Sequence, residues 1–358
     1  MNDPLIIFGL LWIGLAMLGV FVLSSILDVF SRRADRESGG AAVLTRAKGN
    51  PILQPILGRG WDDRAVFNPG AVDLNGIVRL LFRAVGEDGI SRLGYAESEN
   101  GSTISERFPY PVFTTVDPRG VHQEARYDRI IYASGGGWGG TEDPRITKIG
   151  DTLYVTFNMF DGWDFIRVAS TTIKEKDLLS KRWHFTKPLF LSPHGEVHKN
   201  WVLFPEKFEG KFAILHSLSP RIQIDFVDAL EDLHTGKIKI ASRYGQSGPR
   251  EGWDTWVRSA GPPPIKTERG WLLMYHATEA NDMSRYKIGA MLLDSTNPER
   301  VIARSSRPIL EPSLWYENEW KPGIIYACGA VVRNGILFVY YGGGDQSVNV
   351  ASVALKKL

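Results

Sequence analysis

The stretch ITKIGDTLYVTF, residues 146–157, joins a tight turn to an alternating strand. Gly150-Asp151 predicts the turn, and the apolar positions Leu153, Val155 and Phe157 predict a half-buried β-strand after it. The same pattern recurs in VDLNGIVRLLFRA (72–84), EKFEGKFAILHS (206–217), IKTERGWLLMYHA (265–277) and VVRNGILFVYYG (331–342). Repetition at a nearly constant spacing is typical of repeat architectures, so we expect an all-β domain built from five similar units.

A second motif, in which a proline opens a short apolar strand, recurs between these units. Its copies are NPILQP (50–55), YPVFTT (110–115), KPLFLSP (187–193) and RPILEP (307–312). Proline suits an outer strand, because its missing N–H then faces away from the hydrogen-bond ladder. Two interleaved repeats predict a five-bladed β-propeller, whose blades of about four strands surround a central channel. A β-sandwich is the alternative, but it does not explain both repeats.

The N-terminal segment from Leu5 to Leu27 carries no charged side chain. As a helix it would extend roughly 34 Å, compared with a hydrocarbon core of about 30 Å. This predicts a single transmembrane helix, and the arginines that follow at 32, 33 and 36 predict a cytoplasmic location for the rest of the chain. A buried core helix is the alternative. The expected organisation is an anchor at 1–30 that partners the lipid bilayer, a linker at 31–45 and a five-bladed propeller domain at 46–358.

Composition excludes several classes of protein. The 358 residues are 43% hydrophobic, which is enough for a large core, and the formal net charge of +2 is spread along the chain. Without a basic tract we expect no nucleic-acid partner. The one cysteine, Cys328, excludes an intramolecular disulfide. His194 and His198 lie in a stretch broken by proline and glycine, and no nucleotide-binding fingerprint is present, so we expect neither a metal nor an organic cofactor.

An acidic cluster in GTEDPR, residues 140–145, is the first candidate for chemistry. Pro144 donates no hydrogen bond and favours an extended Asp143, so we expect the cluster where the backbone leaves a sheet. Asp143 could brace the turn through Arg145, or it could serve as a positioned acid. The residues by themselves favour the first interpretation slightly.

Together these stretches resemble glycoside hydrolase family 130, the β-mannoside phosphorylases and related hydrolases. The resemblance covers nearly all of the chain after the linker. Its main carriers are VFNPGAV (66–72), LFRAVGEDGISRLGYAES (81–98), GTEDPR (140–145), KNWVLFPEKFEGKFAILHS (199–217), GPPPIKTERGWLLMYHA (261–277) and YKIGAMLLD (286–294). It implies a five-bladed propeller that cleaves β-mannosidic bonds with inorganic phosphate as co-substrate, with inversion, to give α-mannose 1-phosphate.

The resemblance also implies roles for particular residues. Asp143 matches the proton donor, whose proton passes through a hydroxyl of the bound sugar. A positioned acid lowers the barrier because the departing oxygen gains negative charge. Arg167, Lys199 and His276 match the basic residues that bind phosphate. Taken singly, they also fit a surface arginine, a solvated loop lysine and a packed core histidine.

Substrate contacts are implied for Asn68, Arg83, Arg92 and Asp345. The lead-in YYGGGD before Asp345 contains more small residues than the family usually shows. Three alternatives stay open. An inverting hydrolase on the same scaffold would need a second carboxylate roughly 6.5–9.5 Å from the acid, and Glu206 is the candidate. The second is a glycan-binding propeller without catalysis, and the third is a transferase that works on a lipid-linked or nucleotide-activated mannose.

Overall fold

The computed structural model describes residues 44–115, 126–162, 165–242 and 252–358. The chain divides into two compact units, Met1–Ala41 and Ala42–Leu358, and every described residue lies in the second. This second unit is built from β-strands, with two short α-helices and two 3-10 helices in its described part, so the predicted all-β class is confirmed. The predicted division into linker and domain at residue 45 stays a prediction.

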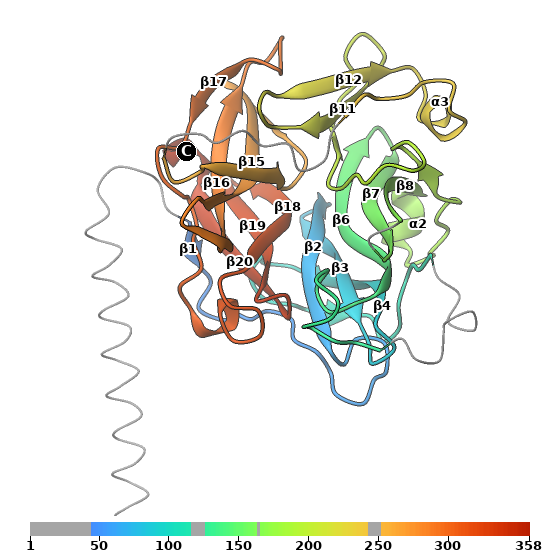
Figure 1. Ribbon diagram of the computed structural model, residues 1–358, viewed down its shortest axis with the longest axis vertical. Coiled ribbons are helices and arrows are strands. Elements are labelled where there is room, and N and C mark those ends of the chain that lie inside the picture. Colours follow the sequence, from blue (N-terminus) through green and yellow to red (C-terminus); the bar gives the residue numbers. More distant parts are fainter. Residues whose placement is uncertain (1–43, 116–125, 163–164, 243–251) are drawn as a thin grey trace, which may run out of the picture. The chain divides into compact units, whose positions relative to one another are not determined.

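The strands form five successive repeats (Figure 1). Repeat 1 holds β2 (Ala65–Leu74), β3 (Ile77–Val85), β4 (Ile90–Ser98) and β5 (Glu106–Arg107), and repeat 2 holds β6 (Gly139–Ile149), β7 (Thr152–Asp161), β8 (Ile166–Lys174) and β9 (Leu189–Phe190). Repeat 3 holds β10 (Val202–Leu203), β11 (Phe212–Ser217) and β12 (Gln223–Val227). Repeat 4 holds β13 (Trp256–Ala260), β14 (Ile265–Thr267), β15 (Gly270–Glu279), β16 (Asp282–Leu293) and β17 (Val301–Arg304). Repeat 5 holds β18 (Ile325–Arg333), β19 (Ile336–Gly343) and β20 (Ser347–Ala354), with β1 (Thr45–Arg46) added beside β20.

The short helices lie outside these strands. They are α2 (Glu175–Leu179), α3 (Glu231–His234), η2 (Trp315–Glu317) and η3 (Leu355–Lys357).

Two-residue hairpin turns lie at all five predicted places; four contain the predicted glycine, whereas Gly270 follows its turn as the first residue of β15. The residues that pair across them are Leu74 with Ile77, Ile149 with Thr152, Phe208 with Lys211, Thr267 with Gly270, and Arg333 with Ile336. In Asn75-Gly76 and Asn334-Gly335 both turn residues have positive φ. This mirror-image turn matches the right-handed twist of the strands that it joins.

The proline motifs occupy the outer edges, as predicted. Leu53 forms a bridge to Val348 in β20, Phe113 to Leu93 in β4, and Leu310 to Ile288 in β16, while β9 pairs with β8. Each motif therefore lies beside the strand that follows the hairpin of its repeat.

The expected five-bladed propeller, with a separate four-stranded sheet for each repeat, is corrected by the hydrogen bonding. The described strands form four sheets, of four, three, five and eight strands. Repeats 1 and 2 share the largest sheet, because β4 and β6 pair in parallel through Ile90 with Gly139 and Ser91 with Gly140. Gly140 permits this approach, since a Cβ atom there would lie 2.2 Å from the Ser91 carbonyl oxygen.

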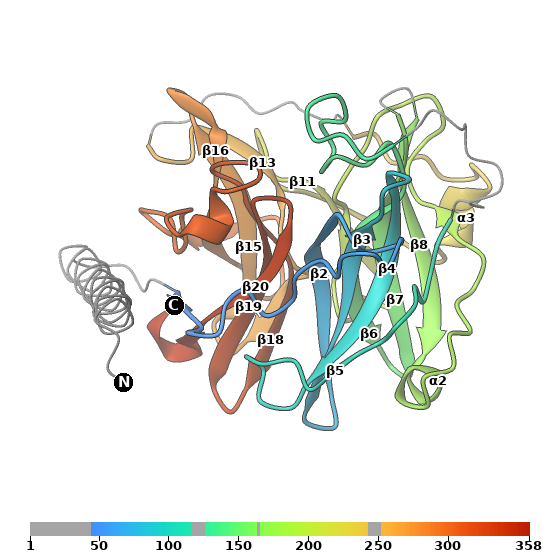
Figure 2. The ribbon, with the colours of Figure 1, turned by 90° about the horizontal axis from the view of Figure 1, so that it is seen from below.

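Apolar side chains fill the space between consecutive repeats. Five clusters of buried residues lie in the described chain between repeats 1 and 2, 2 and 3, 3 and 4, 4 and 5, and finally 5 and 1. The last cluster brings β18 and β20 against β2, and both views show repeat 5 beside repeat 1 there (Figures 1 and 2). Residues from every repeat can therefore reach a shared interior.

The predicted transmembrane helix is also corrected. Across residues 44–358, apart from the three undescribed gaps, no helix has the length and apolar character needed to cross a membrane. Residues 5–27, on which that prediction rested, lie outside the described residues. The predicted single-pass membrane location, the cytoplasmic placement derived from it and the bilayer as a partner therefore lose their basis.

Candidate active site

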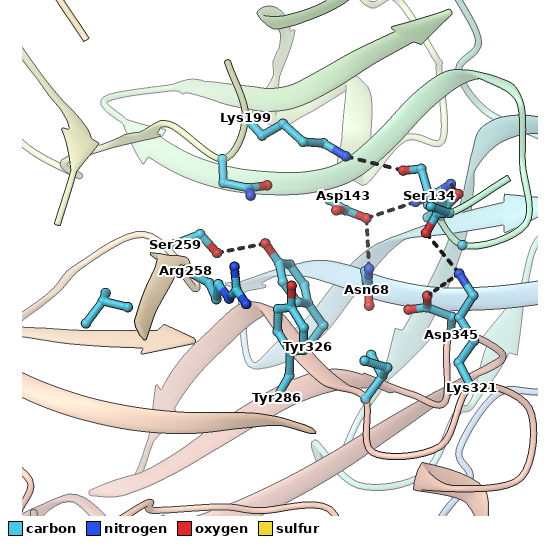
Figure 3. Close-up of a pocket in the computed structure, with 16 residues that line it drawn as sticks. Asn68, Ser134, Asp143, Lys199, Arg258, Ser259, Tyr286, Lys321, Tyr326 and Asp345 are labelled. Carbon is cyan, nitrogen blue, oxygen red and sulfur yellow. Dashed lines mark hydrogen bonds and ion pairs between the residues drawn. The ribbon is translucent and has the colours of Figure 1, made fainter. Parts of the chain in front are cut away.

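A cavity of about 320 Å³ lies where these repeats meet (Figure 3). Its lining comes from repeats 1, 2, 4 and 5 and from the loop ahead of repeat 3. The charged residues of this lining are Arg83, Asp143, Lys199, Arg258, Lys321 and Asp345. Four cations and two carboxylates give the cavity an excess of positive charge, which suits an anionic ligand.

Asp143 and Asn68 reach the cavity from bulges in β6 and β2. The register shifts between Glu142 and Arg145 in β6, and between Phe67 and Gly70 in β2. Both bulges contain a proline after the polar residue, Pro144 and Pro69. Proline is tolerated at a bulge because the ladder is already interrupted there. The acidic cluster thus lies inside a strand, and the expectation that it lies where the backbone leaves the sheet is wrong.

Unusual backbone conformations gather at this cavity. Eight non-glycine residues of the described chain have positive φ. Four of them line the cavity, namely Asn68, Asp143, Asn200 and Asp345. Such conformations cost free energy and persist where the surrounding structure imposes them, which is common at functional sites.

The Asp143 carboxylate is held by donors on the cavity wall. Asn68 Nδ2 donates to Asp143 Oδ1 over 2.8 Å, and Arg83 Nη1 lies 3.4 Å from the same oxygen. Burial by itself raises the pKa of Asp143, but the charges of Arg83, Lys199 and Arg145 outweigh it and hold the pKa below its ordinary value of 3.8. Asp143 is therefore a carboxylate at neutral pH in the unliganded chain.

A second, fully buried carboxylate organises two of the cations. Glu142 accepts from Arg83 Nη2 over 2.8 Å and from Lys199 Nζ over 3.1 Å. Ser134 Oγ donates to Glu142 as well, over 2.7 Å to Oε2, and Lys199 also lies 3.2 Å from that hydroxyl. The negative charge of Glu142 is balanced by Arg83 and Lys199, and Glu142 thereby holds both cations at the cavity wall.

Five of the predicted site residues meet at the cavity. They are Asn68, Arg83, Asp143, Lys199 and Asp345. Asp345 Oδ2 forms an ion pair of 3.2 Å with Lys321, so that the two side chains make one wall together (Figure 3).

Three predicted residues have their contacts elsewhere and are absent from the cavity lining. Arg167 donates to the Ser192 carbonyl and packs over the Phe190 ring at 4.0 Å. Arg92 donates to Asp88 over 3.0 Å. Glu206, the candidate hydrolytic base, accepts from Lys266 over 2.6 Å.

His276 is fully buried and also absent from the lining. It stacks on Tyr326, with ring centroids 3.8 Å apart, and so lies behind a residue that does line the cavity. Burial, and then the charge of Arg145, lowers the pKa of His276 to about 3, which leaves the ring uncharged at neutral pH. The structure thus places it next to the site rather than in it.

Several cavity residues were missed in the sequence. They include Ser134, Asn200, Arg258, Tyr286, Lys321 and Tyr326. Asn200 has a signal, because it follows Lys199 directly. Tyr286 begins the stretch YKIGAMLLD, whereas Ser134, Arg258, Lys321 and Tyr326 belong to none of the motifs quoted above. In the described part of the chain, no group of three or more histidine, cysteine or acidic side chains is arranged to hold a metal ion.

The all-β scaffold carries a polar cavity in which a buried carboxylate lies among cations. These features define an enzyme whose ligands are polar and include an anion. A family model described as beta-1,4-mannooligosaccharide phosphorylase matches residues 58–358, so the chain belongs to glycoside hydrolase family 130. The predicted family is confirmed. The predicted class of enzyme, a glycoside phosphorylase, is confirmed with it.

Individual relatives agree with this assignment. A 1,2-beta-oligomannan phosphorylase of Thermoanaerobacter sp. (strain X514) is 35% identical over 325 residues, which cover 88% of this chain and 98% of the relative. A beta-1,2-mannobiose phosphorylase of the same organism is 33% identical, with the same coverage. The solved structure of the Listeria innocua beta-1,2-mannobiose phosphorylase with beta-1,2-mannobiose has a TM-score of 0.65 at 24% identity, covering 88% of this chain and 97% of that one. This last likeness concerns the fold.

Proposed function

We propose that the chain cleaves β-mannosidic bonds with inorganic phosphate, with inversion, to give α-mannose 1-phosphate. The names of its relatives support phosphorolysis of β-mannosides. The observation that carries the proposal is the cavity itself, in which one buried carboxylate, Asp143, faces a set of cations. An acid and an anion site side by side are what phosphorolysis needs.

Asp143 is the proton source in this proposal. A phosphate oxygen forms a bond to the anomeric carbon on the face opposite the departing group, and the bond from that carbon to the glycosidic oxygen breaks. The departing oxygen takes up the proton that Asp143 supplies, through a hydroxyl of the mannose. Because cations hold the pKa of Asp143 low, a phosphate beside Lys199 would offset their charge and raise the pKa toward that of a working acid.

Lys199 and Arg258 are the proposed phosphate ligands. Both line the cavity, where Lys199 extends toward Ser134 and Arg258 lies beside Ser259 and Tyr326 (Figure 3). Arg258 also donates to Thr278 over 3.3 Å, which anchors its guanidinium. Arg167 and His276 keep to other contacts, so their contribution to phosphate binding would be indirect.

Asn68 and Asp345 are the proposed contacts to sugar hydroxyls. Asn68 lines the cavity and its Nδ2 donates to Asp143, so its side chain lies beside the acid that the sugar must approach. Asp345 also lines the cavity, and its carboxylate can accept from a hydroxyl. Arg83 supports this side by holding Asp143 in place.

The hydrolase alternative lacks a base in this geometry. Glu206 pairs with Lys266 and does not line the cavity. Of the described lining residues, Asp143 and Asp345 are the carboxylates, and Asp345 pairs with Lys321. A water would therefore have no unpaired carboxylate to activate it.

The proposal is tested by exchanging phosphate for chloride. The purified chain is incubated with β-1,2- and β-1,4-mannobiose in matched buffers, and mannose and mannose 1-phosphate are quantified. Formation of α-mannose 1-phosphate that requires phosphate is expected. Mannose release at the same rate in chloride would instead identify a hydrolase, and binding without turnover in either buffer would identify a glycan-binding protein.

A further inference from the structure

Both ring nitrogens of His276 have defined partners. The backbone N–H of Ala327 donates to Nε2 over 2.9 Å. A backbone N–H can only donate, so Nε2 carries no hydrogen, and a neutral His276 must carry its hydrogen on Nδ1. The ring is uncharged at neutral pH because burial and Arg145 lower its pKa to about 3. One backbone contact thus selects one tautomer.

This tautomer begins a chain of hydrogen bonds that ends in the cavity. His276 Nδ1 lies 3.1 Å from Ser259 Oγ, and Ser259 Oγ lies 2.8 Å from the Tyr326 hydroxyl oxygen. Once Ser259 accepts from Nδ1–H, its own hydrogen can be donated to the Tyr326 oxygen. The Tyr326 hydrogen is then left for a partner in the cavity, which both Ser259 and Tyr326 line (Figure 3).

We propose that His276 is a positioning residue that acts through Ser259 to turn the Tyr326 hydroxyl hydrogen toward an oxygen of bound inorganic phosphate. The inference rests on the proposed function and deepens it. His276 does not touch the phosphate. His276 determines whether the Tyr326 hydroxyl presents its hydrogen or an oxygen lone pair to the cavity.

The direction of the chain matters because the ligand is an anion. If Tyr326 instead donated to Ser259, its lone pairs would face the phosphate and repel it. Burial raises the pKa of Tyr326 well above its ordinary value, so the hydroxyl keeps its hydrogen at neutral pH. The charged groups that act on His276 and Tyr326 are Arg145 and Asp143. The stacked rings, at an interplanar angle of 11°, hold the phenol in place.

Two substitutions at His276 separate the two ring nitrogens. In His276→Asn an amide N–H2 can replace Nδ1–H as donor to Ser259, whereas in His276→Gln an amide oxygen can replace Nε2 as acceptor from Ala327. We measure the Kd of inorganic phosphate by calorimetry and the KM values of phosphate and mannobiose for both variants. Tyr326→Phe is expected to weaken phosphate binding about tenfold, His276→Gln to approach that loss, and His276→Asn to stay near the parent. The KM of mannobiose should change little.

A double-mutant cycle shows whether His276 acts through Tyr326. In the Tyr326→Phe background, His276→Gln is expected to have no further effect on phosphate binding. The inference would be overturned if His276→Asn and His276→Gln lost phosphate affinity equally. It would also be overturned if His276→Gln weakened phosphate binding as much in the Tyr326→Phe background as in the parent. A purely structural role would lower the Tm of all variants without changing phosphate affinity.

Two further measurements keep the inference testable if the histidine variants fold poorly. Ser259→Ala interrupts the same chain and should weaken phosphate binding as Tyr326→Phe does. In the parent chain, ¹⁵N NMR of labelled histidine should show His276 protonated on Nδ1, and protonation on Nε2 would contradict the inferred tautomer. If the parent protein requires phosphate for turnover but His276 and Tyr326 show no coupling in phosphate binding, this inference alone is overturned. If the parent protein neither binds nor uses phosphate, the proposed function and the inference are overturned together.

Discussion

The side-chain amide of Asn68 donates to the carboxylate of Asp143 over 2.8 Å, although the two residues are 75 positions apart in the sequence. Both have positive φ, 47° and 53°, and both precede a proline at a bulge. Neighbouring strands of repeats 1 and 2 thus present matching distortions to one cavity. This pair defines where the catalytic chemistry is expected.

Asp143→Asn should lower turnover by about 10²- to 10⁴-fold while the chain stays folded. The amide keeps the shape of the side chain but has no acidic proton to give. Arg83 remains paired with Glu142 at 2.8 Å, so no buried charge is left alone. Steady-state kinetics and thermal unfolding measure the two effects. Asp151→Asn, in an exposed hairpin turn, is the control and should leave turnover unchanged; near-normal activity of Asp143→Asn would contradict the assignment.

Lys199→Met should raise the KM of phosphate about ten- to hundredfold, and that of mannobiose much less, because a charge-assisted contact to the anion is lost. Glu142 keeps Arg83 and Ser134 as partners in this variant. Lys266→Met removes a lysine of the same kind that pairs with Glu206 outside the cavity lining, and it should change neither KM. A larger effect on mannobiose than on phosphate would argue against the proposed anion site.

Glu206→Gln should leave turnover unchanged, in both phosphate and chloride buffers. Its carboxylate pairs with Lys266 and does not line the cavity, so it has no access to a reacting water. Comparison of product formation by the parent and the variant measures the effect. A tenfold or greater loss of activity would return Glu206 to the list of catalytic candidates and favour the hydrolase.

Asp143 should make a measurable contribution to acid stability. Its pKa in the folded chain lies below the ordinary value of 3.8 expected for the unfolded chain, so the unfolded chain binds more protons between these two values. The stabilising contribution is complete above that ordinary value and is lost as the pH falls through the folded pKa. Urea unfolding at a series of acidic pH values should therefore show a shallower loss of stability for Asp143→Asn than for the parent. Parallel curves for the two proteins would refute this.

Two glycine substitutions test how repeats 1 and 2 join. Gly335→Ala, at φ 73° with open space around the new Cβ, should cost about 1–2 kcal/mol for the left-handed backbone. Gly140→Ala adds a clash, since its Cβ would lie 2.2 Å from the Ser91 carbonyl oxygen, and should cost about 1–3 kcal/mol more. Denaturant unfolding gives both values. Equal costs would mean that the close pairing of β4 with β6 is not required.

The repeats were predictable because their signals are local. Asn334-Gly335 adopts the positive φ values of a hairpin turn within a few residues, and the alternating positions beside it identify the strand. The number of sheets was not predictable. It depends on a two-residue parallel pairing between β4 and β6, where the absence of a side chain at Gly140 lets two backbones meet.

The candidate site was partly predictable. Asp143 and Asn68 lie in motifs whose polar residue precedes a proline, and such motifs could be recognised along the chain. Arg167 and Arg258 show the limit of that approach. Both are arginines on strands, but Arg167 lies over the Phe190 ring while Arg258 lines the cavity. The direction in which a strand presents its side chain depends on its place among the other strands.

By itself, the sequence determined the β-hairpins, their outer proline strands and the membership in glycoside hydrolase family 130, because turns and long motifs are properties of neighbouring residues. Tertiary structure alone decided which side chains share the cavity, and that His276 lies behind Tyr326 rather than against a ligand. The physical reason is that burial, hydrogen-bond partners and the local field arise from segments that the chain brings together only on folding.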